Sequence, residues 1–226
     1  MKKRTAFIGA ILSLIPFGQP LLIKTGVVLS TTGLIFSLPE KVNAESAEFY
    51  IKKGIKNHYE NDHSGAIFHY TKAIEIDPNY AAAYYNRGLS KNLIKDNYGA
   101  ISDYTKAIEI NPQFSDAYRD RGVAKRILKD NDGAISDYIK AIEINPKDYK
   151  AYYNRGNLKG DMNDHYGAIS DYTKAIEINP KEYKAYYNRG VAKWKIGDKK
   201  GACLDAHAGN SLGSSKVSKA IELFCQ

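Results

Sequence analysis

A period of 34 residues runs through most of this 226-residue chain. The segment GAISDYTKAIEINP begins at Gly99 and returns unchanged at Gly167, with close variants beginning at Gly65 and Gly133 and a diverged copy at Gly201. A second segment, YYNRG or a variant of it, precedes every copy in the same register. Such a period indicates one supersecondary unit stacked several times, because a unit this short cannot bury its own apolar side chains.

The repeat divides the chain into five units, and each has the pattern of two short helices. The units span residues 47–80, 81–114, 115–148, 149–182 and 183–216. In the second unit, apolar residues recur with the spacing of one face of an α-helix. They are Ala100, Ile101, Tyr104, Ala107 and Ile108. Asn111-Pro112 ends this helix, because the residue before a proline disfavours the α conformation. We therefore expect a helix–turn–helix hairpin in every unit.

Six places of the unit identify the type of hairpin. In the second unit they hold Tyr84, Gly88, Ala100, Tyr104, Ala107 and Pro112, and the first four units keep all six. This pattern resembles the tetratricopeptide repeat (TPR), in a wording similar to bacterial, especially cyanobacterial, members. The resemblance implies an all-α fold, a right-handed α-solenoid of five hairpins. The fifth hairpin is degenerate, and residues 215–226 are predicted to form a capping helix, since a stack must cover its terminal apolar face.

The resemblance implies a non-catalytic scaffold, because the first helices of stacked TPR hairpins line a concave groove that captures a protein or peptide partner. We expect the groove to be lined from the second, fifth, ninth and twelfth places of the units, with the residues of the sixth place as further candidates. The predicted residues are Tyr85, Asn86, Leu89, Arg119, Asp120, Val123, Tyr153, Asn154, Asn157, Tyr187, Asn188, Val191 and Trp194. The other twelfth places hold His58, Asn92, Arg126 and Gly160. Rigid aromatic side chains give contact area, and scattered polar groups fix the register of a ligand.

Two alternatives to groove binding remain open for these positions. The tyrosines at the fifth place pack between neighbouring helices in the first alternative. In the second, the asparagines at the sixth place bond to adjacent helices instead of holding the backbone of an extended peptide, since an amide both donates and accepts.

A charged pair recurs outside the predicted groove. Arginines at the seventh place, such as Arg87, are followed sixteen residues later by an aspartate, such as Asp103. In the first unit the arginine becomes Lys53 and the aspartate becomes His69. This joint change indicates a structural pair within or between hairpins.

The sequence offers no constellation for catalysis, and we expect no enzyme activity and no cofactor. Its five histidines lack the HxxH or HExxH spacing of metal sites, so no metal is expected. The formal net charge of +8 raises the alternative of a helical-repeat protein that binds RNA or another polyanion. Nucleic acid is not the expected partner, because the units are too uniform to read bases and the charge is spread along the chain.

The first 44 residues have the three parts of a secretory signal: a basic start, apolar stretches within residues 6–38, and Val42-Asn43-Ala44 before Glu45. This pattern predicts cleavage between Ala44 and Glu45 and export to a periplasm or lumen. The segment is longer than the usual signal of about 15–30 residues, so a membrane anchor through residues 6–38 is the alternative, followed by a cytoplasmic protein with an unusual leader.

Two cysteines, Cys203 and Cys225, lie near the end of the chain. In an exported protein they are candidates for a disulfide that joins the capping helix to the last hairpin.

Overall fold

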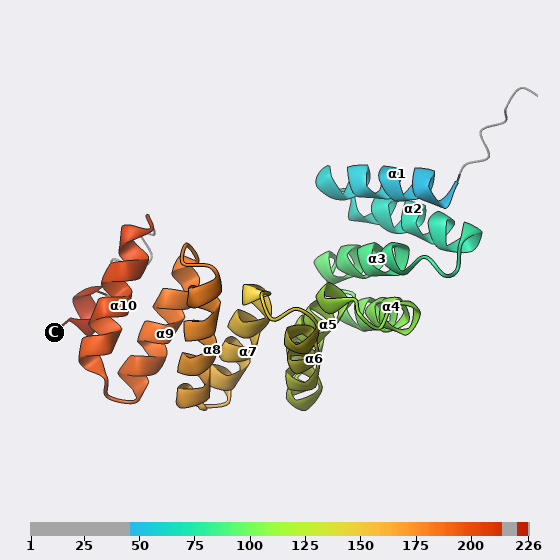
Figure 1. The fold of residues 1–226 in the computed structure, drawn as a ribbon. Helices are drawn as coiled ribbons and strands as arrows, with labels where there is room; N and C mark the ends of the chain where they lie inside the picture. The colour runs from blue at the N-terminus through green and yellow to red at the C-terminus, as the bar shows by residue number, and fades with distance from the viewer. Residues whose placement is uncertain (1–45, 214–220, 226) are drawn as a thin grey trace, which may run out of the picture. The chain divides into compact units, whose positions relative to one another are not determined.

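A computed structural model describes residues 46–213 and 221–225 of the chain. These residues form helices and no strands (Figure 1). The helices are α1 (Ala47–Tyr59), α2 (His63–Ile76), α3 (Ala81–Leu93), α4 (Asn97–Ile110), α5 (Ser115–Ile127), α6 (Asn131–Ile144), α7 (Tyr149–Asp161), α8 (His165–Ile178), α9 (Tyr183–Lys195) and α10 (Lys199–Ser211). Each repeat unit contributes one antiparallel pair, and neighbouring pairs pack against each other. The all-α array of hairpins predicted from the repeat is confirmed.

Parts of the predicted organisation lie outside the described residues. These are the signal or anchor segment, residues 1–44, with the cleavage site between Ala44 and Glu45, and most of the capping helix predicted at residues 215–226. Of that helix, residues 221–224 are described and are helical. Among the described helices, none combines the length and the apolar character that crossing a bilayer requires.

The turn inside each hairpin is built by the same local chemistry. In the second hairpin, Lys95 adopts a left-handed conformation with φ of 66° and reverses the chain after α3. The carboxylate of Asp96 then accepts a hydrogen bond of 2.9 Å from the backbone N–H of Gly99 and caps the first turn of α4. Aspartates at the same place cap α2, α6, α8 and α10.

The two helices of a hairpin approach closely where a glycine faces a tyrosine ring. A Cβ atom on Gly88 of α3 would lie 2.7 Å from Cε1 of Tyr104 on α4, which is too close for any side chain. The glycine is therefore required by packing, and the ring of Tyr104 is fully buried beneath it. The same contact joins Gly54 to Tyr70, Gly122 to Tyr138 and Gly156 to Tyr172.

The fifth hairpin replaces this tyrosine with Ala206, and the end of the chain fills the space. Phe224 is buried against Ala202 and Ala206, and its ring comes within 3.5 Å of the position of a Cβ on Gly190. It also stacks on Trp194 with ring centroids 5.4 Å apart. The divergence of the fifth unit thus makes room for a residue of the C-terminal helix.

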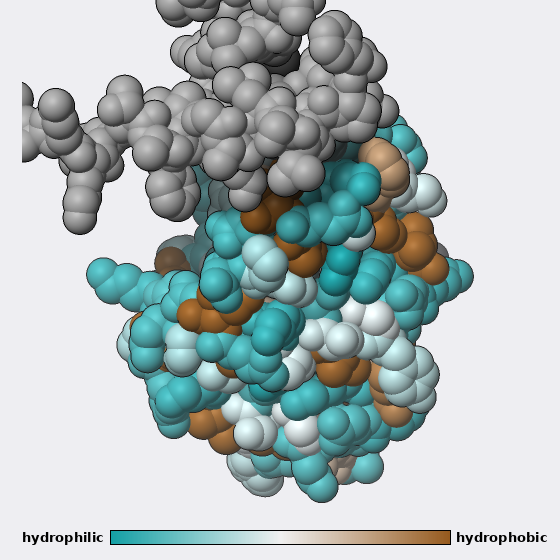
Figure 2. Space-filling view, turned by 90° about the vertical axis from the view of Figure 1, so that its right-hand side faces the viewer, coloured by the Kyte–Doolittle hydropathy of each residue, from teal (hydrophilic) through white to brown (hydrophobic). Residues whose placement is uncertain are grey.

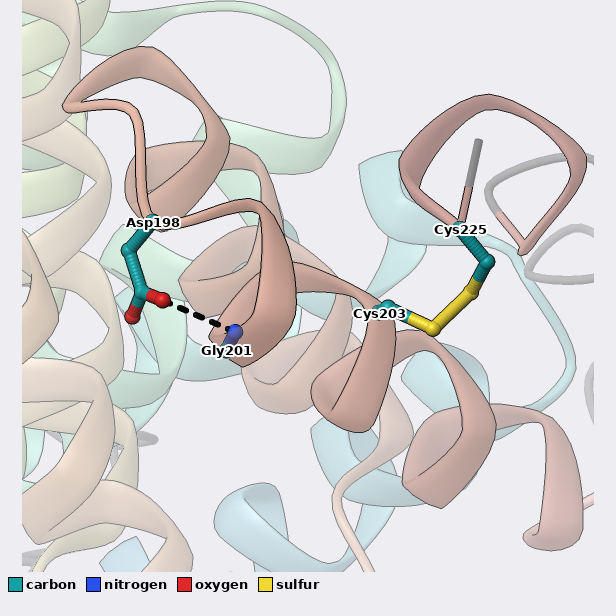
Figure 3. The surroundings of a disulfide bond; sticks show 4 residues. All are labelled: Asp198, Gly201, Cys203 and Cys225. Atoms are coloured by element: carbon teal, nitrogen blue, oxygen red, sulfur yellow. Dashed lines mark hydrogen bonds between the residues drawn. A yellow bond between two sulfur atoms is a disulfide. The ribbon is translucent and has the colours of Figure 1, made fainter.

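A disulfide joins this C-terminal segment to α10. Cys203 on α10 and Cys225 are bonded, and the closed loop has a sequence separation of 22 residues (Figure 3). In the same view, Asp198 caps the start of α10 at the backbone N–H of Gly201. The last hairpin is therefore held to the C-terminal segment by a covalent bond as well as by the buried ring of Phe224.

The recurring arginine and aspartate form a buried structural pair, as their joint change predicted. Arg87 donates two hydrogen bonds, of 2.9 and 2.7 Å, to the carboxylate of Asp103, which is 3% exposed. Lys91 adds a second cation at 2.9 Å. Arg121, Arg155 and Arg189 make the same bidentate contact with Asp137, Asp171 and Asp205. Bidentate geometry fixes the orientation of the two helices.

These arginines also connect successive hairpins, with one exception. Arg87, Arg121 and Arg189 each donate to a threonine on the second helix of the preceding hairpin, at 3.0–3.1 Å. At the junction between α6 and α7, Ile139 stands where the first, second and fourth hairpins have threonine, and Arg155 has no such bond within the described part of the chain. This junction instead carries a buried ion pair between Arg119 and Asp148, at 2.7 Å.

Candidate functional site

The first helices of the hairpins lie side by side along the array. Contacts join α1 to α3, α3 to α5, α5 to α7 and α7 to α9. The predicted groove residues lie on α3, α5, α7 and α9, so the structure brings them onto one series of neighbouring helices. On the face shown in Figure 2, apolar side chains stand in small groups among hydrophilic ones, and the visible described residues form no single large apolar area.

Two tyrosines at the fifth place bond to the following hairpin. The hydroxyl of Tyr85 donates to Asp120 at 2.8 Å, and Tyr153 accepts from Asn188 at 3.1 Å. Burial and the carboxylate of Asp120 raise the pKa of Tyr85, so this hydroxyl stays neutral and remains a donor. These bonds correspond to the helix-to-helix alternative for the fifth and sixth places.

The asparagine side chains at the sixth place of the second and fourth hairpins make no such bonds. Asn86 and Asn154 are half-buried on the same series of helices. Within the described residues their side chains have no hydrogen-bond partner, unlike Asp120 and Asn188. Their amides are therefore free to bond to a ligand.

The fifth place of the third hairpin holds a buried charge cluster in place of a tyrosine. Arg119 is 9% exposed and bonds to the carboxylates of Asp116, Asp120 and Asp148. Burial alone would lower the pKa of Arg119, but the carboxylates of Asp120 and Asp148 outweigh it and raise the pKa, so the guanidinium stays charged. Arg119 is thus committed to holding α5 against the start of α7, and it presents little surface to a ligand.

A hollow of about 450 Å³ opens between α7 and α9, and we call it the α7–α9 hollow. Three predicted groove residues line it: Asn157, Asn188 and Val191. Its other lining residues are Arg126, Gly160, Asp161, Asn163, His165, Tyr172, Ala192 and Lys195. The volume lies in the range of pockets that hold small ligands or single side chains of a partner.

Hydrogen bonds fix the polar wall of this hollow. Oδ1 of Asn157 accepts from the hydroxyl of Tyr172 at 2.9 Å and from Nδ2 of Asn188 at 2.8 Å. Burial raises the pKa of Tyr172, which keeps the hydroxyl neutral. At the edge, Arg126 of α5 pairs with Asp161 of α7 at 2.7 Å. The wall is therefore preorganised by bonds that join four helices, α5, α7, α8 and α9.

The other predicted residues lie around or away from this hollow. Val123 lines a neighbouring hollow of about 490 Å³, which shares Arg126 and Asp161 with the first. Leu89 and Tyr85 pack against the apolar cluster around Tyr104. Tyr187 is 37% exposed on α9. Trp194 stacks on Phe224 and belongs to the core at the end of the chain, not to the hollow.

Sequence reasoning did not single out Asp161, His165 and Lys195 as site residues. Asp161 and Lys195 are the last residues of α7 and α9, next to the twelfth place, and His165 is the first residue of α8. The signal that could have found them is the glycine at the twelfth place of the fourth unit, since a missing side chain there exposes its neighbours.

A cluster of metal-ligand type occurs at the end of the chain. Ligand atoms of Cys203, His207 and Cys225 lie within 4.8 Å of one another. The two sulfurs are joined in the disulfide, and a metal binds the thiolate form of cysteine. The cluster is therefore a covalent link and not a free ligand set.

Comparison with protein families returns one type of repeat. Models described as "Tetratricopeptide repeat" match residues 149–182 and 81–114, and one described as "TPR repeat" matches residues 58–91 and 124–163. Together the matches span residues 58–114 and 124–182, just over half of the chain. No curated protein matches the chain.

Solved structures of similar fold include TPR proteins. The crystal structure of MamA has 27% identity and a TM-score of 0.67, over 77% of this chain and 95% of that chain. The first TPR of Spaghetti (RPAP3) bound to HSP90 peptide SRMEEVD has 26% identity and a TM-score of 0.51, over 52% and 94%. YrrB, described as a TPR protein with an unusual peptide-binding site, has 22% identity and a TM-score of 0.64, over 81% and 94%, and this likeness shows the fold alone.

Proposed function

Because this chain belongs to the tetratricopeptide repeat family, we propose that it is a non-catalytic scaffold that captures a peptide or protein in the groove of its first helices. The observation that carries this proposal is the α7–α9 hollow, where Asn157, Asn188 and Val191 meet around an open space. Preorganised polar groups beside an apolar wall are what recognition of a peptide requires.

Two further observations support a protein partner over RNA or another polyanion. The TPR of RPAP3, which is similar to half of this chain, was solved with a peptide bound. In addition, the lysines and arginines that recur in hairpins two to five are bonded to buried aspartates, as Arg87 and Lys91 are to Asp103. Neutralised cations contribute little to the attraction of a phosphate backbone.

The proposed compartment is extracytoplasmic or at a membrane surface, where the scaffold would act in the assembly of a complex. Its support is the signal-like pattern before Glu45 together with the disulfide between Cys203 and Cys225, since disulfides persist in oxidising compartments. Sequencing the N-terminus of the protein recovered from fractionated cells tests this. A start at Glu45 supports export, and an intact Met1 in the soluble cytoplasmic fraction refutes it.

Selection from a displayed library of random peptides tests groove binding. We expect the purified chain to enrich a family of related peptides. The double variant Tyr187→Ala with Val191→Glu, verified as folded by circular dichroism, should lose about tenfold or more of the affinity for them, because Tyr187 is exposed on α9 and Val191 lines the hollow. Lys174→Ala is the matched control, since this lysine is exposed on a second helix. Enriched peptides that bind the groove variant as tightly as the unaltered chain would refute the groove.

A further inference from the structure

Gly160 is a helical glycine that neither close packing nor a positive φ explains. Gly160 lies within α7, where a glycine is less favourable than alanine because it loses more backbone freedom on folding. A Cβ at this position would meet nothing closer than the Tyr172 hydroxyl at 3.8 Å and Ala168 at 3.9 Å, which are ordinary contacts. Gly156, one turn earlier on the same helix, differs sharply, because a Cβ there would lie 2.9 Å from the ring of Tyr172.

Gly160 instead leaves space beside the α7–α9 hollow. Neighbouring hairpins carry large side chains at the same twelfth place, Arg126 and Trp194. Gly160 lines the hollow, so a side chain of that size at this position would project into the open volume. Glycine at this position therefore keeps a space open that a ligand can fill, at the cost of a less stable helix.

The wall of the hollow specifies the chemistry of what can fill it. Asn157 and Asn188 bond to each other, Oδ1 of the first accepting from Nδ2 of the second. Nδ2 of Asn188 also donates to Tyr153, and Oδ1 of Asn157 also accepts from Tyr172. Within the described residues, no protein group bonds to the opposite end of either amide. Among the lining residues, the NH2 group of Asn157 is thus left as a donor and the carbonyl oxygen of Asn188 as an acceptor.

This donor and acceptor remain whichever way round the two amides are placed. Because the amides bond to each other, reversing both exchanges the donor and the acceptor but leaves one of each. A carboxylate would meet the cation Lys195 in the lining but would set its lone pairs against the amide acceptor. An ammonium would set its protons against the donor, and a hydrocarbon would leave both amide groups unbonded. A carboxamide, which donates and accepts at once, can bond to both.

We propose that the α7–α9 hollow receives a carboxamide side chain, glutamine or asparagine, from the bound peptide. Val191 and Ala192 supply an apolar side for the methylene groups of that residue, and Asn157 and Asn188 bond to its amide. The pair Arg126 and Asp161 closes one edge and neutralises its own charge. This subsite rests on the proposed peptide-binding function and determines its specificity.

The test uses peptides selected by the unaltered chain from a displayed random library. We expect glutamine or asparagine to be enriched at one fixed position, and replacing it by glutamate or methionine in a synthetic peptide to weaken binding about tenfold or more. Gly160→Trp, which fills the space, should abolish the preference, whereas Gly160→Ala, which adds only a Cβ in ordinary contact, should keep it. Circular dichroism verifies that each variant is folded.

A second variant keeps the test decisive if Gly160→Trp does not fold. Asn157→Leu gives the fourth hairpin the apolar type of residue that the ninth place has elsewhere, as at Leu89 and Val191. We expect it to lose the preference for a carboxamide and to bind the methionine peptide at least as well as the glutamine peptide.

The outcomes separate the subsite from the function on which it rests. Enriched peptides without a fixed carboxamide, with an acidic residue in its place, or with equal affinity for Gly160→Trp would overturn the subsite and leave the groove intact. A library from which the unaltered chain enriches no peptide would overturn the groove itself and the subsite with it.

Discussion

At the scale of single residues, the same amino acid has two different roles on one helix. Gly156 lies where α7 and α8 approach most closely, and the ring of Tyr172 occupies the space that any side chain would need. Gly160 lies one turn later beside open volume. Packing accounts for the first glycine, and ligand binding is our account of the second.

Alanine substitutions distinguish these roles by the sign of their effect. Gly156→Ala should lower the free energy of unfolding by about 1–3 kcal/mol, because the added Cβ forces the Tyr172 ring to move. Gly160→Ala should raise it by about 0.5–1 kcal/mol, because alanine is the better helix former and nothing obstructs it. Urea denaturation followed by circular dichroism measures both, and a destabilised Gly160→Ala would contradict our description of the hollow.

We expect His58 to make the stability of the first hairpin depend on pH. Burial, and then the nearby His63, lower the pKa of His58 from its ordinary 6.5, while its Nδ1 lies 3.2 Å from Oγ of Ser90 on α3. A lowered pKa means that the unfolded chain takes up the proton first as the pH falls. The contribution of His58 to stability is therefore present above about pH 6.5 and is lost as the pH drops toward the folded-state pKa.

We expect the denaturation midpoint to fall between pH 7.5 and pH 5.5, and to fall less in His58→Gln. Glutamine keeps a polar group near Ser90 but does not titrate. Denaturant titrations of both proteins at the two pH values provide the measurement. An equal drop of the midpoint in the two proteins would show that His58 does not contribute to the pH dependence of stability.

At the scale of elements, the junctions between hairpins are not equivalent. An arginine–threonine bond crosses from α2 to α3, from α4 to α5 and from α8 to α9. Between α6 and α7 the threonine is replaced by Ile139, which is 40% exposed, and this junction carries the buried ion pair of Arg119 with Asp148. A buried ion pair contributes less than its short distance suggests, because both charges lose their water. We therefore regard this junction as the weakest contact in the array.

Restoring the threonine tests this view of the junction. Ile139→Thr should stabilise the protein by about 0.5–1.5 kcal/mol, because Arg155 gains an acceptor while a residue already half exposed loses little apolar contact. Thr105→Ile is the converse change, at a junction that has the bond, and it should lower the free energy of unfolding by a similar amount. Thermal melts of the two variants give the comparison. If both changes shift stability in the same direction, the bond is not the cause.

The sequence predicted the hairpins almost completely, because a repeated unit restates its own pattern in every copy. The pairing of Arg87 with Asp103 also followed from the repeat, since Lys53 and His69 change together. The second cation, Lys91, was missed because its pairing depends on how the carboxylate of Asp103 is oriented after folding. No spacing along the chain contains that information.

The site was predicted less well than the fold, again for physical reasons. The groove-facing places follow from helix geometry, but a hollow depends on which of them lack a side chain and which are already bonded. Tyr85 and Tyr153 face the neighbouring hairpins and bond there. Trp194 was expected in the groove, and it packs on Phe224 because the alanine at position 206 leaves a gap that the end of the chain fills.

At the scale of the whole molecule, stability is distributed over hairpins and over the contacts between neighbours. In such an array, each unit is stabilised by those beside it, and a terminal unit has only one neighbour. The disulfide between Cys203 and Cys225 compensates for this at the C-terminal end. It closes a loop with a sequence separation of 22 residues, so the chain-entropy estimate of its contribution is about 3 kcal/mol.

Reducing the disulfide should therefore weaken the last hairpin more than the others. We expect faster hydrogen exchange in α9 and α10 after treatment with a dithiol, and little change in α3 and α4. The double variant Cys203→Ser with Cys225→Ser should exchange at the same elevated rate without the reagent. Uniform acceleration along the whole chain would show instead that the array unfolds as a single unit.

Phe224 has a consequence for how copies of this protein meet. Hairpins so alike that one stacks on the next could in principle stack from molecule to molecule, and a head-to-tail contact that does not close into a ring grows into a filament. Here Phe224 packs against the apolar residues of the last hairpin, and the neighbouring Cys225 is disulfide-bonded to α10. Because this C-terminal segment covers apolar surface of the last hairpin, we expect it to hinder head-to-tail stacking between copies.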